Sequence, residues 1–265
     1  MSDPGKWGDL RLRVMSGLVV LVIGLSAIWA GGSAVRLLSV VAAGVMIWEL
    51  ARLTAPNRPQ SARALGVIAA GSMVPIFLEH GPYWLAMLAV PSLVGVLMPR
   101  RDRITFAVYG FCVMLAAYAV VAFREGYGLG FVLWIVLVVI VSDVMGYFGG
   151  RMLGGPKFWP AVSPKKTWSG TAAGWAGAAV VGLGAVIWAG QPLFVIGFSA
   201  LTAFAAQMGD IGESAIKRRM GAKDSSQLIP GHGGLMDRFD GFVGASVFVI
   251  LWGLAGLPLP VFGGI

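Results

Sequence analysis

Acidic residues are scarce in this chain of 265 residues, and five of its twelve fall within one short window. They are Asp210, Glu213, Asp224, Asp237 and Asp240, and the same window holds the basic residues Lys217, Arg218, Arg219, Lys223 and Arg238. The window begins at the end of one apolar run and ends where another begins. Ionisable groups are costly at such positions unless they face a polar cavity. The window is therefore the first candidate for a functional site.

Helical spacing orders the first part of this window. If a helix continues past Gly209, then Asp210, Ser214 and Arg218 share one face at intervals of four residues. Glu213 and Lys217 then lie beside that face. The alternative interpretation is a helix end that carries structural salt bridges.

A glycine-rich turn follows. The run Pro230-Gly-His-Gly-Gly234 has little side-chain bulk, so its backbone N–H groups can approach an anion closely. Asp237 and Asp240 then stand three residues apart on the first turns of the next expected helix. The positive end of a helix suits carboxylates, bound phosphate, and a metal that joins the two.

A second polar segment looks complementary to the first. Asp143 ends an expected apolar helix, and Gly146, Tyr147, Arg151 and Lys157 follow it. The run Ser163-Pro-Lys165-Lys166-Thr167-Trp168 then leads into the next expected helix. Two lysines, two hydroxyls and an aromatic ring at a helix start could contact phosphate and a base or headgroup. Basic residues at a membrane surface with a Trp anchor explain the same run equally well.

Carboxylates, cations and a glycine turn together indicate a magnesium–nucleotide site. Mg²⁺ takes one or two carboxylates together with substrate phosphates and water, and Lys or Arg neutralises charge on a transferred phosphoryl group. The chain has no Walker A sequence and no dinucleotide-binding fingerprint, so these two common nucleotide folds are unsupported.

Composition places the chain in a membrane. Hydrophobic residues make up 57% of it and charged residues only 12%, whereas soluble domains carry about 25% charged residues. The single cysteine, Cys112, cannot form an internal disulfide, and no Cys/His cluster has zinc spacing.

We expect an all-α, polytopic integral membrane protein with about nine transmembrane helices. The candidate stretches lie near residues 14–31, 33–51, 63–79, 83–99, 104–122, 127–146, 169–189, 192–209 and 241–262. We treat 1–265 as a single membrane domain, in which 1–125 supplies N-terminal helices and 126–265 is the catalytic half with polar segments 147–168 and 210–240. The spacings Gly146-x-x-x-Gly150 and Gly170-x-x-x-Gly174 fit close helix contact, although a chain with 39 glycines produces such spacings easily by chance.

The basic residues predict the orientation. With a cytoplasmic N-terminus, all Lys and Arg except Arg36 and Arg124 fall in the cytoplasmic pieces 1–13, 52–63, 100–103, 147–168 and 210–240. Both long polar segments then face the cytoplasm of a multi-pass cell-membrane protein. The net charge of +8 is explained by anionic lipid headgroups, without a nucleic-acid partner.

The residues resemble a known family at this point. Ser214-Ala-Ile-Lys217-Arg218 through Lys223-Asp224, followed by Pro230-Gly-His232-Gly-Gly-Leu-Met-Asp237-Arg238-Phe-Asp240, is similar to the signature of the phosphatidate cytidylyltransferases, the CDP-diacylglycerol synthases. Asp143-x-x-Gly146-Tyr147 with Ser163-Pro-Lys-Lys166-Thr-Trp168 resembles a second block of that family. The chain has Ser169 where the family usually has Glu or Gln, and Gly146 where it often has Ala.

The resemblance implies the reaction of CTP with phosphatidate to give CDP-diacylglycerol and pyrophosphate at the cytoplasmic face. It implies Asp210 and Asp237 as ligands of Mg²⁺, with a second cation such as K⁺ left open. The catalytic set expected from it is Asp210, Lys217, Arg218, Lys223, Asp237 and Arg238. The substrate-binding set is Ser163, Lys166, Thr167, Ser214, Asp224, His232, Gly233, Gly234 and Asp240.

Alternatives remain open. A related CTP-dependent transferase or kinase could act on another membrane lipid, and a transporter is the non-enzyme alternative. A transporter would place ionisable residues near mid-membrane in several helices, whereas here they gather toward one face. Glu49, at an expected cytoplasmic helix end, is a candidate to support the site indirectly, and a homodimer is one possible assembly.

Overall fold

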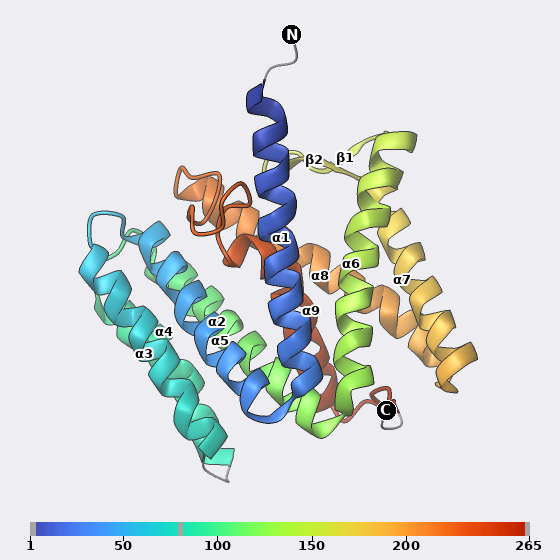
Figure 1. Ribbon diagram of the computed structural model, residues 1–265, viewed down its shortest axis with the longest axis horizontal. Coiled ribbons are helices and arrows are strands. Elements are labelled where there is room, and N and C mark those ends of the chain that lie inside the picture. The colour runs from blue at the N-terminus through green and yellow to red at the C-terminus, as the bar shows by residue number, and fades with distance from the viewer. Residues whose placement is uncertain (1–3, 79–81, 263–265) are drawn as a thin grey trace. The chain divides into compact units, whose positions relative to one another are not determined.

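Helices make up most of the chain. The computed structural model describes residues 4–78 and 82–262, with the backbone alone for residues 4–14. The first helices are α1 (Pro4–Ala30), α2 (Gly32–Thr54), α3 (Pro59–Leu78), the 3₁₀ helix η1 (Pro82–Ala89), α4 (Val90–Leu97) and α5 (Arg103–Gly126) (Figure 1). They are followed by α6 (Gly128–Leu153), strands β1 (Lys157–Trp159) and β2 (Ser163–Thr167), α7 (Trp168–Ala189), α8 (Phe194–Arg219) and α9 (Met236–Leu254).

Six of these helices are long and apolar enough to cross a bilayer, namely α2, α3, α5, α6, α7 and α8. Large apolar side chains such as Leu18, Val67 and Trp188 are exposed on helix surfaces, which in water would be unfavourable but in lipid is not. These features indicate a membrane protein built from helices.

Two expected stretches differ from the helices observed. The stretch 83–99 is divided into η1 and α4, and Pro91 at the start of α4 lacks the N–H that a continuous helix would use. The stretch 241–262 is helical only to Leu254, because Gly256 adopts a left-handed conformation (φ 72°) and Pro258 and Pro260 follow.

The expectation of purely helical structure is wrong for the segment after α6. Strands β1 and β2 pair as an antiparallel hairpin, with Lys157 opposite Thr167 and Trp159 opposite Ser163. The run from Ser163 that we expected at a helix start is therefore a strand, and α7 begins only at Trp168. The helix before the hairpin continues to Leu153, so Asp143 lies within α6 and not at its end.

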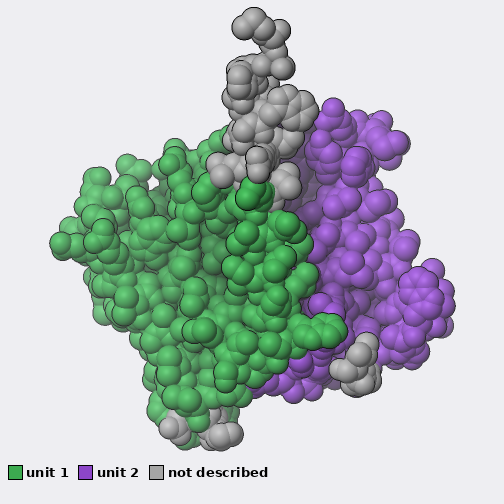
Figure 2. All heavy atoms as spheres, in the orientation of Figure 1, with its two compact units in different colours: residues 1–121, 220–239 green, residues 122–219, 240–265 purple. Residues whose placement is uncertain are grey.

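The chain forms two compact units, coloured separately in Figure 2. Unit 1 comprises Met1–Val121 and Met220–Phe239, and unit 2 comprises Ala122–Arg219 and Asp240–Ile265. The first boundary lies close to the division we expected near residue 125. The segment 220–239, which we grouped with the catalytic half, belongs to unit 1.

Glycines set the closest helix contacts within each unit. In unit 1, a Cβ on Gly66 of α3 would lie 2.8 Å from the carbonyl oxygen of Gly44 on α2. In unit 2, a Cβ on Gly170 of α7 would lie 2.6 Å from the carbonyl oxygen of Gly146 on α6, and 3.2 Å from Cα of Gly150. The small-residue spacings in α6 and α7 therefore mark a true helix contact.

Gly170→Ala should destabilise the protein, because the new methyl group meets backbone that cannot move without separating α6 from α7. We expect a loss of about 1–3 kcal/mol, typical of overpacking, measured as a lower Tm in detergent. Gly197→Ala on α8, where nothing lies within 4 Å of the new Cβ, is the matched control. It should leave Tm unchanged or slightly raised, because Ala favours helix over Gly. Equal Tm values for the two variants would contradict the contact.

Candidate active site

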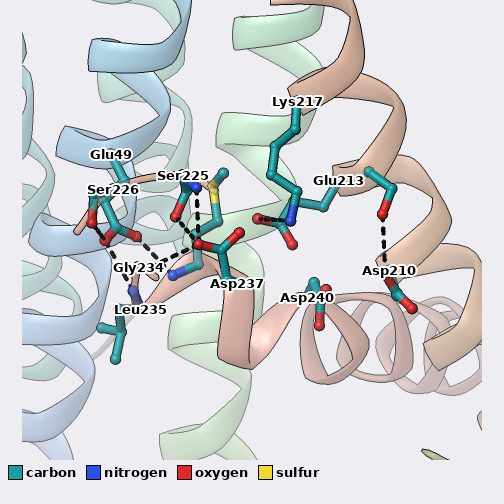
Figure 3. A network of polar contacts seen from close by, with 12 residues as sticks. Glu49, Asp210, Glu213, Lys217, Ser225, Ser226, Gly234, Leu235, Asp237 and Asp240 are labelled. Atoms are coloured by element: carbon teal, nitrogen blue, oxygen red, sulfur yellow. Dashed lines mark hydrogen bonds and ion pairs between the residues drawn. The ribbon is translucent and has the colours of Figure 1, made fainter. Parts of the chain in front are cut away.

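Two groups of polar residues carry the expected site, and each is described within its own compact unit. Unit 1 holds the loop 220–235 and the first turn of α9, together with Glu49 on α2. Unit 2 holds the end of α8, the hairpin, and Asp240 on α9. Figure 3 shows side chains of both groups.

Asp237 organises the loop of unit 1. Its Oδ2 accepts hydrogen bonds from the Ser225 amide at 2.9 Å, the Ser225 hydroxyl at 2.8 Å and the Gly234 amide at 2.7 Å (Figure 3). The side chain is buried. Hydrogen bonds to a carboxylate are stronger than those between neutral groups. Because the three donors share one oxygen, they also fix the direction in which Oδ1 points.

Glu49 supports the same loop from α2. Its Oε1 accepts hydrogen bonds from the Ser226 hydroxyl at 2.6 Å and the Leu235 amide at 2.9 Å. Its Oε2 accepts one from the Met236 amide at 2.7 Å. The carboxylate is fully buried and lies at the N-terminus of α9, where first-turn N–H groups lack partners and the helix dipole favours negative charge. The indirect supporting role expected for Glu49 therefore has a concrete geometry.

These contacts correct our interpretation of the glycine-rich turn. We expected its backbone amides to receive a substrate anion. The amides of Gly234, Leu235 and Met236 are instead occupied by the protein's own carboxylates, those of Asp237 and Glu49. A Cβ on Gly234 would lie 2.0 Å from the Ser225 hydroxyl oxygen and 2.4 Å from Oε1 of Glu49, which explains the absence of a side chain there. Gly233 has a positive φ of 83°, and a Cβ on it would lie 2.6 Å from Oδ2 of Asp237.

His232 contacts α1 on the other side of the loop. Its Nδ1 lies 2.9 Å from the Ser16 hydroxyl, which donates to the carbonyl oxygen of Pro230 at 2.9 Å. Because a hydroxyl has one hydrogen, this arrangement makes Nδ1 the donor and leaves Nε2 as the second ring nitrogen. The side chain thus fixes the turn to α1, a structural role that the sequence did not indicate.

The remaining charged residues of the unit 1 group are exposed. They are Lys223, Asp224 and Arg238. Exposed cations beside an anchored loop are able to meet an anionic ligand without first breaking a buried contact.

In unit 2, α8 continues to Arg219 and has the predicted helical pattern. The Ser214 hydroxyl donates to Oδ1 of Asp210 at 3.3 Å, and Nζ of Lys217 lies 3.4 Å from Oε1 of Glu213. Both pairs are four residues apart, as expected. Arg218 on the same helix is exposed.

Asp240 lies at the start of α9, before the apolar part of that helix. Burial raises the pKa of its carboxyl, and the negative charge of Asp210 raises it further. A side-chain hydrogen bond with Glu213 acts in the opposite direction. Two carboxyl groups can share such a bond only if one is protonated. Crowded acids of this kind would favour a cation close by.

Lys166 extends from β2 to α8. Its Nζ lies 2.5 Å from Oδ2 of Asp210, and 3.4 Å from the carbonyl oxygen of Gln207. Both charged side chains are partly exposed, at 24% for Lys166 and 33% for Asp210. The pair joins the two sequence blocks that we considered separately, and it places a lysine directly at an expected metal-binding carboxylate.

A polar pocket of about 460 Å³ opens beside this ion pair, within the size range of small-molecule sites. Residues from α6, the hairpin, α7 and α8 line it: Ser142, Asp143, Gly146, Tyr147, Gly150, Arg151, Lys165, Lys166, Thr167, Gly170, Thr171, Gln207 and Asp210. Its charged side chains are three cations and two acids. The pocket therefore has a net positive lining suited to phosphate.

The two hydroxyls of the hairpin have different surroundings. Thr167 is the N-cap of α7, and its Oγ1 accepts from the Gly170 amide at 3.2 Å. It also lies 3.0 Å from the hydroxyl of Ser169, which in turn donates to the carbonyl oxygen of Gly154. Thr167 lines the pocket, whereas Ser163 is not among the lining residues. Ser169 thus helps to join the start of α7 to the end of α6.

Sequence reasoning missed Gln207. Its Nε2 donates to the Ser142 hydroxyl at 3.2 Å, and its Oε1 accepts from the indole of Trp175 at 3.0 Å. This amide links α6, α7 and α8 at the pocket wall. A polar residue within the apolar run 201–208 was the available signal, since buried polar groups in helices need specific partners.

Comparison with known proteins now identifies the relationship. The model of the cytidylyltransferase family matches residues 11–254. The chain belongs to the cytidylyltransferase family. It is 33% identical to the phosphatidate cytidylyltransferase of Brucella abortus biovar 1 (strain 9-941), over 92% of this chain and 93% of that protein. It is 28% identical to the phosphatidate cytidylyltransferase of Staphylococcus aureus (strain COL), over 88% of this chain and 95% of that protein.

Membership of this family makes a metal the next question. Among the described residues, no three His, Cys, Asp or Glu side chains are grouped as a metal site of their own. Mg²⁺ in phosphate chemistry commonly uses only one or two protein carboxylates and completes its shell with phosphate oxygens and water. Asp210 and Asp237 fit this requirement as single-carboxylate donors, and the raised pKa of Asp240 fits a unit 2 group with excess negative charge.

Glu49→Ala should lower the stability of the protein. The substitution leaves the Ser226 hydroxyl and the amides of Leu235 and Met236 without their acceptor. Buried donors without partners cost about 1–3 kcal/mol each, so Tm in detergent should fall clearly. Glu49→Gln keeps one acceptor oxygen and should fall in between.

Glu125→Gln is the matched control, because Glu125 is an exposed acid at the end of α5. Its Tm should equal that of the unchanged protein. A Glu49→Ala variant as stable as this control would refute the supporting role of Glu49.

Proposed function

We propose that this protein transfers the cytidylyl group of CTP to phosphatidate and thereby forms CDP-diacylglycerol and pyrophosphate. The observation that carries the proposal is the likeness to relatives named phosphatidate cytidylyltransferase, which covers 92% of this chain and 93% of the Brucella protein. The net positive pocket beside Asp210 supports a phosphate-bearing substrate.

The chemistry needs no strong general base. A phosphate oxygen of phosphatidate attacks the α-phosphorus of CTP, the new P–O bond forms, and the bond to pyrophosphate breaks. A phosphate monoester carries about −1.5 to −2 charge at pH 7, so the attacking oxygen is already deprotonated. The protein must chiefly reduce repulsion between two anions and hold them in line.

We assign the positioning of phosphates to the cations. Lys166 in the pocket would contact the phosphate of phosphatidate, with Thr167 beside it. Lys217, Arg218, Lys223 and Arg238 would neutralise the phosphates of CTP. Ser163, Ser214, Asp224, His232, Gly233, Gly234 and Asp240 would complete the substrate contacts or shape the loop that makes them.

We assign Mg²⁺ to Asp210 and Asp237, with a second cation such as K⁺ as an additional ligand of the site. When bound, Mg²⁺ would offset negative charge on the reacting phosphates and help to orient them. Asp237 would keep its carboxylate in place through the loop hydrogen bonds of Ser225 and Gly234.

We also propose the arrangement in the cell membrane. The apolar part of α1, the η1–α4 pair and the part of α9 after Asp240 would join the six long apolar helices to give nine spans. The distribution of Lys and Arg then places the N-terminus and the reaction on the cytoplasmic side. The same distribution leaves no need for a nucleic-acid partner, and a homodimer is the assembly that we propose to test.

Pyrophosphate release by the purified protein tests the reaction. Release should require CTP, phosphatidate and Mg²⁺ together, and fail with ATP or without lipid. Asp237→Asn should reduce it by about a hundredfold or more, the usual effect of losing a group that stabilises transferred charge. Glu125→Gln should leave it unchanged. Release with another lipid phosphate alone would replace the substrate, and lipid flux without CTP turnover would favour the transporter.

Lys166→Met should reduce turnover by about a hundredfold, because it removes a cation aimed at phosphate but keeps the bulk of the side chain. Lys157→Met is the matched control, since Lys157 lies exposed on the partner strand and does not line the pocket. Activity should be measured as phosphatidate concentration varies. Equal activity of both variants would remove Lys166 from the substrate site.

A further inference from the structure

A second pocket, apolar and of about 530 Å³, lies between α6 and α7 within unit 2. We call it the α6–α7 groove. From α6 it is lined by Gly130, Leu133, Trp134, Leu137, Val141 and Met145. From α7 it is lined by Gly177, Val180, Val181, Gly184, Ala185, Trp188 and Ala189, and Phe262 completes it.

The groove arises because the two helices touch at one end only. Near the hairpin, Gly146 and Gly170 bring their backbones together. Toward the other ends the helices diverge (Figure 1). Gly177 and Gly184 on α7 add no side chains to fill the space that opens.

The groove continues from the polar pocket along the same helices. On α6, Ser142 and Gly146 line the polar pocket, while their neighbours Val141 and Met145 line the groove. On α7, Thr171 lines the polar pocket and Gly177 lines the groove less than two turns further on. The helix pair thus changes from a cationic lining to an apolar lining along its length.

This sequence of linings matches an anionic amphiphile. Arg151, Lys165 and Lys166 in the polar pocket suit a phosphate headgroup. The groove from Gly177 to Ala189 is about 18 Å long at 1.5 Å per helical residue. That length is close to one leaflet, which is half of about 30 Å of hydrocarbon.

We propose that the α6–α7 groove binds one acyl chain of the phospholipid substrate while its phosphate occupies the polar pocket. The proposal rests on the proposed function, because it takes phosphatidate as that substrate. The groove then contributes selectivity for chain length, through shape and not through the hydrophobic effect, since the chain leaves an equally apolar bilayer.

Gly184→Leu should shorten the groove from within. A Cβ at this position already lies 3.0 Å from the Trp188 ring. We expect kcat/KM for dipalmitoyl phosphatidate to fall by about tenfold relative to dioctanoyl phosphatidate, a typical effect of misfit by a few methylenes. Trp188→Ala should enlarge the groove and shift the ratio the other way.

Gly197→Leu is the matched control, because it adds the same side chain to an open position on α8. Its ratio between the two substrates should stay that of the unchanged protein. If both Gly184→Leu and Trp188→Ala leave the ratio unchanged, or if Gly197→Leu shifts it equally, the groove is not a chain-length subsite.

Photolabelling tests occupancy without turnover. The probe is phosphatidate with a diazirine at the end of one acyl chain, added to the full-length protein without CTP. Labelled peptides should fall within residues 177–189 and 130–145, and excess unlabelled phosphatidate should remove the label while phosphatidylcholine should not. Equal competition by phosphatidylcholine would mean that ordinary bilayer lipid fills the groove, and would overturn the proposal.

The two failures are distinguishable. Loss of specific labelling with intact pyrophosphate release would refute the groove and leave the proposed reaction standing. Specific labelling without pyrophosphate release would retain the groove as a site for an anionic lipid and refute the proposed reaction.

Discussion

The loop before α9 depends on two buried carboxylates. Glu49 and Asp237 together accept six hydrogen bonds, from Ser225, Ser226 and the backbone that begins α9. Such a loop, rich in glycine and polar residues, has too few apolar side chains to be held by packing. Charge-assisted hydrogen bonds replace that packing. The position of every residue in the loop, including its exposed cations, follows from these contacts.

This arrangement changes how the loop can meet a nucleotide. A glycine-rich turn usually attracts phosphate with its own amides, but here three successive amides serve internal carboxylates. Phosphate recognition therefore falls to side chains, and Lys223 and Arg238 are exposed for it. Side-chain cations bring full charges and can adjust as pyrophosphate departs, whereas fixed amides cannot.

Local patterns in the sequence predicted the features that depend on nearby residues. The apolar stretches gave six long helices, and the four-residue spacing in α8 gave the pairs Asp210–Ser214 and Glu213–Lys217. The hairpin was not predicted, because its strands of 3 and 5 residues are polar and β2 contains a proline. No local pattern could show that Glu49 contacts Met236, because 187 residues separate them. The family signature named Asp237, but not the loop contacts that hold it.

The ion pair of Lys166 with Asp210 shows how the pocket is kept ready for an anion. Three cations and two acids line the pocket, so it carries one net positive charge when all five are ionised. Asp210 also raises the pKa of Asp240, so negative charge is already crowded on that side. A phosphate dianion that entered alone would leave the site net negative. A cation that arrives with the substrate balances the charge, and it frees Lys166 from Asp210 to contact phosphate instead.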